Sequence, residues 1–466
     1  MTDVADTLAP PAAARPPAID GRTRRLLEAP VLSLLLRMTW PNMLIMVAQA
    51  STGLIETWWV SKLGTDALAG MALVFPPVML MTMISAGAVG GGISSAVARA
   101  LGAGRHAEAD ALVLHQAVIN LVAGIGFSAL FLLFGTPIYR LMGGQGGELH
   151  AALAYSNTVF AGNALIWLMN GLASVIRGTG NMLFPAIVIC FGVAFLVPIS
   201  PLLIFGFGPI AGLGIIGGGV ALLLFYAAGT VVMAWYILAG RTPLRFRWVR
   251  LRWSLFKGIL RVGAVSALTS IQTNMTLAGA TAMVASVAGV DAVAGFGTGA
   301  RLEFLLIPQS FGVGAPLVAL VGTNIGAGQG ARALKIALAG GAIAFAVTEV
   351  IGVTAALFPQ AWLSLFSAEP AMIEAGSGYL RIVGPFYGFF GLGMALYFAS
   401  QGAGRLFWPL ASGFLRVVIA LGGGYLALRL TGSLTALFVA LAVALAAFGM
   451  TILVAVRSGA WFRTNV

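Results

Sequence analysis

Twelve long apolar stretches dominate this sequence of 466 residues. A helix that crosses a membrane needs about 20 mostly apolar residues. The stretches reach that length, and they are too long and too uniformly apolar for the alternating strands of a barrel. They lie at 34–60, 68–95, 111–135, 152–176, 183–206, 210–239, 259–286, 292–322, 333–358, 376–400, 407–430 and 433–456. The sequence therefore predicts an all-α integral membrane protein with twelve transmembrane helices.

The few charged residues indicate how the chain is oriented in its membrane. Asp, Glu, Lys and Arg make up only 9% of the residues, against about 25% in a soluble domain. With the N-terminus inside, 20 of the 26 Lys and Arg residues fall in cytoplasmic segments and 4 fall outside, while Arg301 and Arg416 lie within stretches. Cytoplasmic loops carry such an excess of basic residues. The net charge of +12 is thus explained by the orientation of the chain in its membrane, and we expect no nucleic-acid partner. We expect both termini to be cytoplasmic and the chain to lie in the inner membrane of a bacterium.

The chain also contains one internal repeat. Three short motifs recur at an offset of 224 or 225 residues: Gly64–Gly70 with Gly289–Gly295, Leu101–Gly104 with Ile325–Gly328, and Arg177–Gly180 with Gln401–Gly404. Tyr155 and Tyr379 keep the same spacing. We therefore expect two homologous six-helix lobes, related by a pseudo-twofold axis along the membrane normal and enclosing a central cavity. The predicted divisions are a disordered cytoplasmic tail at 1–33, lobes at 34–240 and 258–456, a basic cytoplasmic loop at 241–257, and a cytoplasmic tail at 457–466.

Several kinds of chemistry are not supported by the sequence. None of the three lysines follows a glycine, as the Walker A motif of a nucleotide-binding loop requires. The single cysteine, Cys190, and the scattered histidines show no metal-ligand spacing. No HExxH, GxSxG or CxxC motif is present. We therefore expect no enzymatic activity, no metal site and no cofactor, and nothing in the chain indicates an ATPase subunit as partner.

Glu56 is the ionisable residue that lies deepest in the first stretch. Asn42 and Gln49 precede it by 14 and 7 residues, and Thr52 by 4. Because seven residues drift only about 20° around a helix, these four side chains form one polar stripe. Taking a carboxylate out of water favours its protonated form, and ionisable residues inside a membrane usually face a cavity. The stripe therefore predicts that Glu56 exchanges a proton or holds a cation; the alternative is a carboxyl group held by neighbouring amides for helix packing.

Other polar residues within the stretches are candidates to line the cavity. Asn163 and Asn170 share a face of the fourth stretch, and Thr273 belongs to a threonine face of the seventh. Arg301 and Glu303 are two residues apart in the eighth, so they point in different directions. Glu303 either joins the cavity or pairs with another helix, and these alternatives remain open. Glu349, in the ninth stretch, is expected to have a structural role.

Together these motifs resemble the MATE (multidrug and toxic compound extrusion) family of transporters. The resemblance rests on Glu56 followed by Gly64-Thr-Asp-Ala-Leu-Ala, on Leu101–Gly104, and on Arg177–Gly180 with Pro185, together with the second-lobe copies of these motifs. It extends over residues 34–456. The family resemblance implies twelve helices in two lobes around a V-shaped cavity, and export of amphipathic, often cationic compounds in exchange for H⁺ or Na⁺.

The sequence departs from this family in ways that bear on the coupling ion. Family members usually carry Asp where this chain has Glu56, and some Na⁺-coupled members use acids in helices seven and ten. The stretches 259–286 and 376–400 contain no acid. We therefore expect H⁺ antiport, with Na⁺ coupling as the alternative and a lipid-linked precursor flippase as a more distant one. The expected partners are small amphipathic or cationic substrates and the lipid bilayer, and we expect a monomer.

Overall fold

The computed structural model describes residues 20–208, 210–459 and 461. These residues form a nearly all-helical protein with one two-residue hairpin. In chain order the elements are α1 (Gly21–Glu28), α2 (Val31–Ser61), α3 (Thr65–Thr82), the π-helix η1 (Met83–Val89), α4 (Gly90–Gly102), α5 (His106–Leu141), α6 (Gly146–Ala161), α7 (Asn163–Gly178), α8 (Leu183–Phe205), β1 (Gly206–Phe207), β2 (Ile210–Ala211), α9 (Ile215–Leu238), α10 (Trp253–Val287), α11 (Val290–Gly326), α12 (Gly330–Leu357), α13 (Pro359–Leu363), α14 (Pro370–Val383), the 3-10 helix η2 (Gly384–Phe386), α15 (Tyr387–Ala403), α16 (Phe407–Val417), the π-helix η3 (Val418–Gly423), α17 (Gly424–Thr431) and α18 (Leu434–Arg457).

The prediction of twelve transmembrane helices is confirmed. Within the described residues, 11 helical segments are long and apolar enough to cross a membrane. The pair α6 and α7, which bends by 50° at Gly162, makes the twelfth. This pair covers the stretch 152–176 that the sequence predicted as one helix. Three other spans contain a π or 3-10 segment where the sequence gave no sign of one: α3–η1–α4, α14–η2–α15 and α16–η3–α17.

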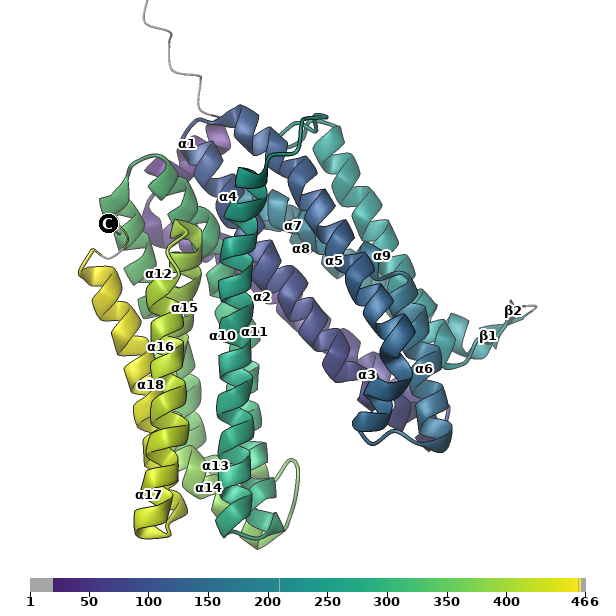
Figure 1. Cartoon of the computed structure of the whole chain (residues 1–466), viewed down its shortest axis with the longest axis vertical. Coiled ribbons are helices and arrows are strands. Elements are labelled where there is room, and N and C mark those ends of the chain that lie inside the picture. Colours follow the sequence, from purple (N-terminus) through teal and green to yellow (C-terminus); the bar gives the residue numbers. More distant parts are fainter. Residues whose placement is uncertain (1–19, 209, 460, 462–466) are drawn as a thin grey trace, which may run out of the picture.

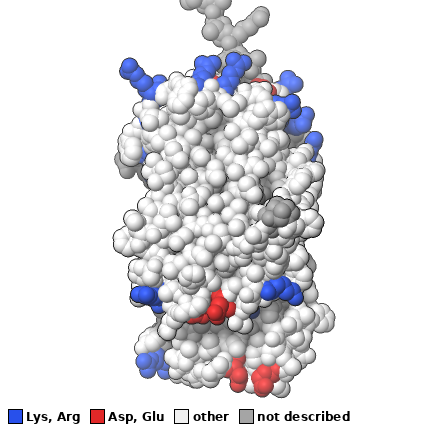
Figure 2. Space-filling view, turned by 90° about the vertical axis from the view of Figure 1, so that its right-hand side faces the viewer, with Lys and Arg blue, Asp and Glu red and all other residues white. Residues whose placement is uncertain are grey.

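The helices form two lobes that diverge like the arms of a V (Figure 1). Helices α2–α9 build one lobe and α10–α18 the other. The lobes meet at the end that carries α1, the loop between α9 and α10, and the C-terminus of α18; we call this the basic end. They separate toward the end that carries the turns at 62–64 and 143–145, which we call the open end. Figure 2 shows charged side chains near both ends with a broad uncharged belt between them, as a membrane-spanning protein requires.

The internal repeat appears directly in how the two lobes contact each other. At the basic end, Gly102 of α4 abuts the backbone carbonyl of Thr323 in α11. Gly326, which is equivalent to Gly102 at an offset of 224, abuts the carbonyl of Arg99 in the same way. A side chain at either glycine would collide with the other lobe's backbone, so both positions require glycine. These reciprocal contacts confirm the pseudo-twofold relation of the lobes.

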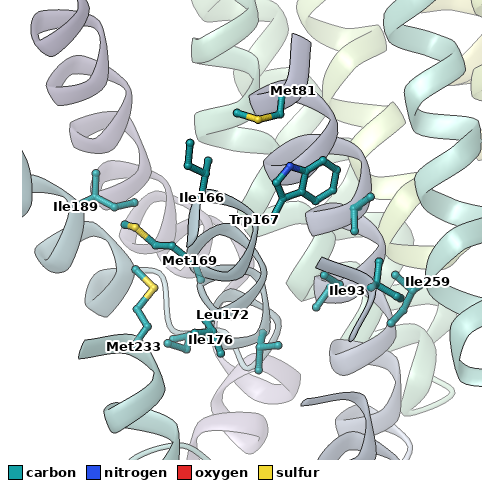
Figure 3. Close-up of a cluster of buried hydrophobic side chains, with 14 of the residues drawn as sticks. Met81, Ile93, Ile166, Trp167, Met169, Leu172, Ile176, Ile189, Met233 and Ile259 are labelled. Atoms are coloured by element: carbon teal, nitrogen blue, oxygen red, sulfur yellow. The ribbon is translucent and has the colours of Figure 1, made fainter. Parts of the chain in front are cut away.

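The core of the first lobe extends across the boundary between the lobes. Trp167 of α7 is 1% exposed and lies among Met81, Ile93 and Ile166 (Figure 3). Its ring centroid is 5.6 Å from that of Phe127. Ile259, from α10 of the second lobe, belongs to the same buried cluster. The first turns of α10 therefore pack against the first lobe at the basic end.

Two segments differ from the expected lobe boundaries. The predicted tail 1–33 includes α1, which Asp20 caps by accepting a hydrogen bond from the Arg22 backbone at 3.1 Å. Helix α1 forms because Leu26 and Leu27 are buried and because Asn324 donates to the Leu26 carbonyl at 3.3 Å. Residues 1–19 of that tail lie outside the described residues. The predicted loop 241–257 ends early, because α10 begins at Trp253.

The loop between the lobes is fastened to α5 by hydrogen bonds to buried side chains. The backbone N–H of Arg245 donates to Asp110 Oδ1 at 2.7 Å. The backbone N–H of Arg252 contacts His115 Nε2 at 2.9 Å. Arg247 forms an ion pair with Asp110 at 3.5 Å. The basic loop is thus an ordered strap across the basic end.

Candidate functional site

The Glu56 carboxyl group is buried inside the first lobe, between α2, α8 and α9. Its residue is 8% exposed. Ser200 Oγ in α8 donates to Glu56 Oε2 at 2.9 Å. The other oxygen, Oε1, is buried without a hydrogen-bond partner. Gly218 of α9 lies beside the group, since a Cβ at that position would be in ordinary van der Waals contact with Oε2, at 3.6 Å. No ion pair among the described residues involves Glu56, so no basic side chain fixes its charge.

The polar stripe predicted on α2 is not uniformly buried. Asn42 is fully buried, with neither amide atom hydrogen-bonded. Gln49 is exposed and Thr52 is half-buried. The Thr52 hydroxyl donates to the Ala48 carbonyl within its own helix, at 2.8 Å. The helix turns gradually away from a seven-residue repeat and contains Pro41, so residues 14 apart do not meet the same neighbours.

The polar residues predicted on the fourth stretch all lie on α7, but they contact different helices. Asn163 Nδ2 donates to the Gly124 carbonyl of α5 at 3.0 Å. Asn170 Nδ2 donates to Ser85 Oγ in the π-helix η1 at 2.8 Å. Arg177, near the end of α7, is 6% exposed and donates to Ser174 Oγ at 3.2 Å. Its guanidinium lies 5.9 Å from the ring centre of Phe311 in the second lobe. Arg177 therefore lies where the lobes meet.

Glu303 lies in the second lobe and pairs with Arg416 of α16. Their side chains are 16% and 8% exposed. The Arg416 guanidinium also packs against the rings of Phe390 and Phe448, at 5.3 and 5.8 Å. A cavity of about 30 Å³ beside this pair is also lined by Thr273, with room for little more than a water molecule or two. Of the two alternatives that the sequence left for Glu303, the structure shows pairing with another helix.

The two remaining candidates lie apart from these groups. Arg301 is exposed, with its guanidinium 5.7 Å from the ring centre of Phe366. Among the described residues, no hydrogen bond or ion pair joins Arg301 to Glu303, to Arg416 or to Glu56. Glu349 accepts a hydrogen bond from the Gly388 backbone at 2.8 Å. That contact joins α12 to α15 and agrees with the structural role expected for Glu349.

Two groups of residues at the site were missed by the sequence reasoning. Ser200 is the one hydroxyl-bearing residue of the apolar helix α8, and that isolation was the available signal. The second group joins the lobes at the basic end. Ser95 Oγ donates to the carbonyls of Gln401 and Gly402 at 2.5 and 3.0 Å, and Arg99 donates to Gly402 at 3.0 Å. A serine and an arginine four residues apart give no sequence signal for a partner 300 residues away.

The described residues contain no cluster of three or more His, Cys, Asp or Glu side chains that could hold a metal ion. The candidate site consists of three parts: the Glu56 carboxyl group within the first lobe, the Glu303–Arg416 ion pair within the second, and the hydrogen-bonded contact between the lobes at the basic end.

Comparison with known proteins places this arrangement in a family. The family model MatE matches residues 41–202 and 266–426, one match in each lobe. A protein of Shewanella oneidensis named FAD transporter is 28% identical over 80% of this chain and 82% of its own. A probable multidrug resistance protein NorM of Thermotoga maritima is 25% identical, over 82% of each chain.

Solved structures share the fold. A MATE crystal structure in the bent conformation superposes with a TM-score of 0.86 at 23% identity, covering 95% of this chain and 98% of that one. A MOP superfamily transporter from Pyrococcus furiosus, described as having a binding pocket of reverse polarity, gives a TM-score of 0.85 at 23% identity, covering 94% and 98%. With both lobes matched by the family model, the chain belongs to the MATE family of membrane transporters.

Proposed function

We propose that this chain exports amphipathic compounds in exchange for protons, and that Glu56 carries the exchanged proton. The observation that supports this most is the environment of Glu56: a buried carboxyl group with one oxygen bonded to Ser200 and the other unpartnered. Two other acids within the apolar stretches have partners, since Glu303 pairs with Arg416 and Glu349 accepts from a backbone N–H. Proton uptake at Glu56 changes a charge that no neighbouring cation balances.

In this mechanism the two lobes move as units about their contact at the basic end. Deprotonated Glu56 favours substrate binding, and protonation alters the packing of α2 against α8 and α9 so that substrate leaves. The proposal includes a bacterial inner-membrane location with both termini in the cytoplasm, so the V opens outward. It also includes a monomer that needs no cofactor beyond the coupling ion, no metal, no ATPase partner and no nucleic acid. Na⁺ coupling and lipid-linked precursor flipping are the less favoured alternatives.

Flux measurements in proteoliposomes test the coupling. We expect an imposed proton gradient to drive export of a cationic dye such as ethidium, and a sodium gradient alone to drive none. Glu56→Gln should abolish proton-driven flux, whereas Glu56→Asp should retain part of it, because the aspartate keeps the titratable group. Glu349→Gln is the matched control, since it removes another carboxylate of the spans, and its flux should stay near the wild-type value.

The coupling proposal fails if the folded Glu56→Gln protein still exports dye down a proton gradient at the wild-type rate. It also fails if sodium gradients drive the flux as well as proton gradients do. Folding of each variant is checked by size-exclusion chromatography and thermal unfolding, so a loss of flux cannot be confused with a loss of structure.

A second candidate substrate, which differs in charge from the cationic compounds expected from the family, has specific support.

 A flavin dinucleotide is that candidate, because the relative named FAD transporter matches four-fifths of this chain. The buried Arg177, which forms no ion pair among the described residues, could attract its pyrophosphate. Counterflow of FAD in the same proteoliposomes tests this. Flux that Arg177→Gln reduces would support it, and an absence of FAD flux alongside dye export would exclude it.

A further inference from the structure

A second, larger cavity lies in the second lobe at the basic end, away from Glu56 and from the Glu303 pair. It has a volume of about 230 Å³, several times that of the cavity beside Glu303. It is formed by the first turns of α10, the turn between α15 and α16, the last turn of α18, and Trp461. Two arginines, Arg261 and Arg405, line it together with Phe407, Trp408 and Trp461, and no acid among the described residues does.

Arg405 is held by an ordered turn. Gly404 adopts a left-handed conformation with φ of 70°, and the backbone N–H of Arg405 then donates to the Ser400 carbonyl at 2.9 Å. Trp461 forms part of the cavity wall: it is 6% exposed, and its indole N–H donates to Ser400 Oγ at 3.2 Å. The cavity is thus a built feature of the fold.

The charges and the aromatic rings indicate what the cavity can bind. Arg261 and Arg405 are exposed, and neither forms an ion pair among the described residues. A guanidinium group presents N–H donors whose geometry matches a phosphate. Phe407 and Trp408, which are 67% and 43% exposed, provide an apolar rim at the level where aromatic residues meet lipid headgroups. Basic pockets between transmembrane helices are known to bind anionic lipid headgroups.

We propose that this cavity binds the phosphate of an anionic phospholipid from the leaflet at the basic end. Arg261 and Arg405 hold the phosphate, and the first part of an acyl chain lies along Phe407 and Trp408. The site differs in place and chemistry from the proposed coupling carboxyl group, and it does not depend on which ion drives transport.

The position of this cavity connects it to the contact between the lobes. Its wall includes Ser400 and Gly404, which flank the carbonyls of Gln401 and Gly402 that accept hydrogen bonds from the first lobe. The guanidinium of Arg99, from the first lobe, also lies against Gly404. A bound lipid would therefore touch the same turn that joins the lobes at the basic end.

Native mass spectrometry of the full-length protein, supplied with phosphatidylglycerol or phosphatidylcholine, tests the proposal. We expect one phosphatidylglycerol to be retained, and the zwitterionic lipid to be retained at least tenfold less. Arg261→Gln with Arg405→Gln should lower phosphatidylglycerol retention about tenfold. The matched control is Arg381→Gln with Arg429→Gln, which removes two exposed arginines outside the cavity and should leave retention unchanged.

Two further arms distinguish the lipid from a soluble phosphate and avoid reliance on a variant. Inorganic phosphate and glycerol 3-phosphate at millimolar concentration should not displace the lipid; displacement by either would overturn the assignment to a phospholipid. A photoactivatable phosphatidylglycerol added to the wild-type protein should crosslink to residues 404–410. Crosslinks elsewhere only, or equal lipid retention by the cavity variant and its control, would overturn the proposal.

Discussion

The replacement of Gly102 by alanine should weaken the contact between the lobes at the basic end. A Cβ at this position would collide with the backbone carbonyl oxygen of Thr323 in the other lobe. Backbone cannot rotate out of the way as a flexible side chain can, so the lobes must separate locally. Gly326 makes the reciprocal contact with the Arg99 carbonyl, and Gly326→Ala should have the same effect.

The size of this effect follows from the geometry of the collision. Inserting a methyl group into a closely packed contact costs about 1–3 kcal/mol. Only the arrangement in which the basic end is closed bears this cost. Since about 1.4 kcal/mol corresponds to a tenfold change in an equilibrium, the closed arrangement should become roughly 5- to 150-fold less populated relative to one with the lobes apart there. Transport that requires both arrangements should slow accordingly.

Distance measurements between spin labels can detect this shift. Arg105→Cys and Gln329→Cys place labels at equivalent positions of the two lobes at the basic end, in a Cys190→Ser background. Double electron–electron resonance should show a longer distance in the Gly102→Ala protein. Gly126→Ala is the control, because a Cβ there meets nothing within 4 Å. Unchanged distances and unchanged dye flux in Gly102→Ala would refute the reasoning.

Three further predictions concern stability. Glu303→Gln leaves the buried Arg416 guanidinium without its charged partner and should destabilise the protein by about 3–5 kcal/mol. The double variant Glu303→Leu with Arg416→Met should recover most of this loss in thermal unfolding. Equal losses in the single and double variants would contradict the pairing. Asn42→Leu removes two buried amide atoms that have no partner, so the unfolding temperature should rise, and a fall would show that the amide has a partner. Asp20→Ala removes the cap of α1 at a cost of about 1 kcal/mol, so hydrogen exchange should quicken in α1 while exchange in α2 stays unchanged.

Much of the fold could be predicted because apolar length and internal repetition are local properties of the sequence. Each stretch of about 20 apolar residues became a span, and Gly102 and Gly326 proved to be reciprocal contacts. The bend at Gly162 could not be predicted, since both halves of that span are equally apolar. The π-segments were also missed, because they depend on how a helix packs against its neighbours.

The site was predicted less completely, for a different physical reason. The burial of Glu56 could be inferred from its position within an apolar stretch. The partners of each polar group could not, because they come from helices that are distant in the sequence. Ser200 lies 144 residues from Glu56, and Arg416 lies 113 residues from Glu303. Helical spacing also overstated the stripe on α2, where Gln49 is exposed although Asn42 and Glu56 are buried.

The two lobes share one scaffold but differ in their buried charges. Tyr155 and Tyr379 mark equivalent places, 224 residues apart. Near Tyr155 lies Glu56, since both approach within 4 Å of the Cβ position of Gly218. Tyr379 lines the small cavity of the second lobe together with Glu303, which is paired with Arg416. The carboxylate of Glu303 thus has a cationic partner, whereas that of Glu56 has none among the described residues.

At an offset of 224 or 225, the counterpart of Glu56 is Ala280 or Thr281, and neither has a carboxyl group that could exchange a proton. If one carboxyl group per molecule exchanges a proton, only the first lobe changes its internal packing with protonation, and the second lobe moves as a rigid body. Proton-to-substrate stoichiometry near one, measured by flux of both in the same vesicles, is then expected. A value near two would contradict exchange at Glu56 alone.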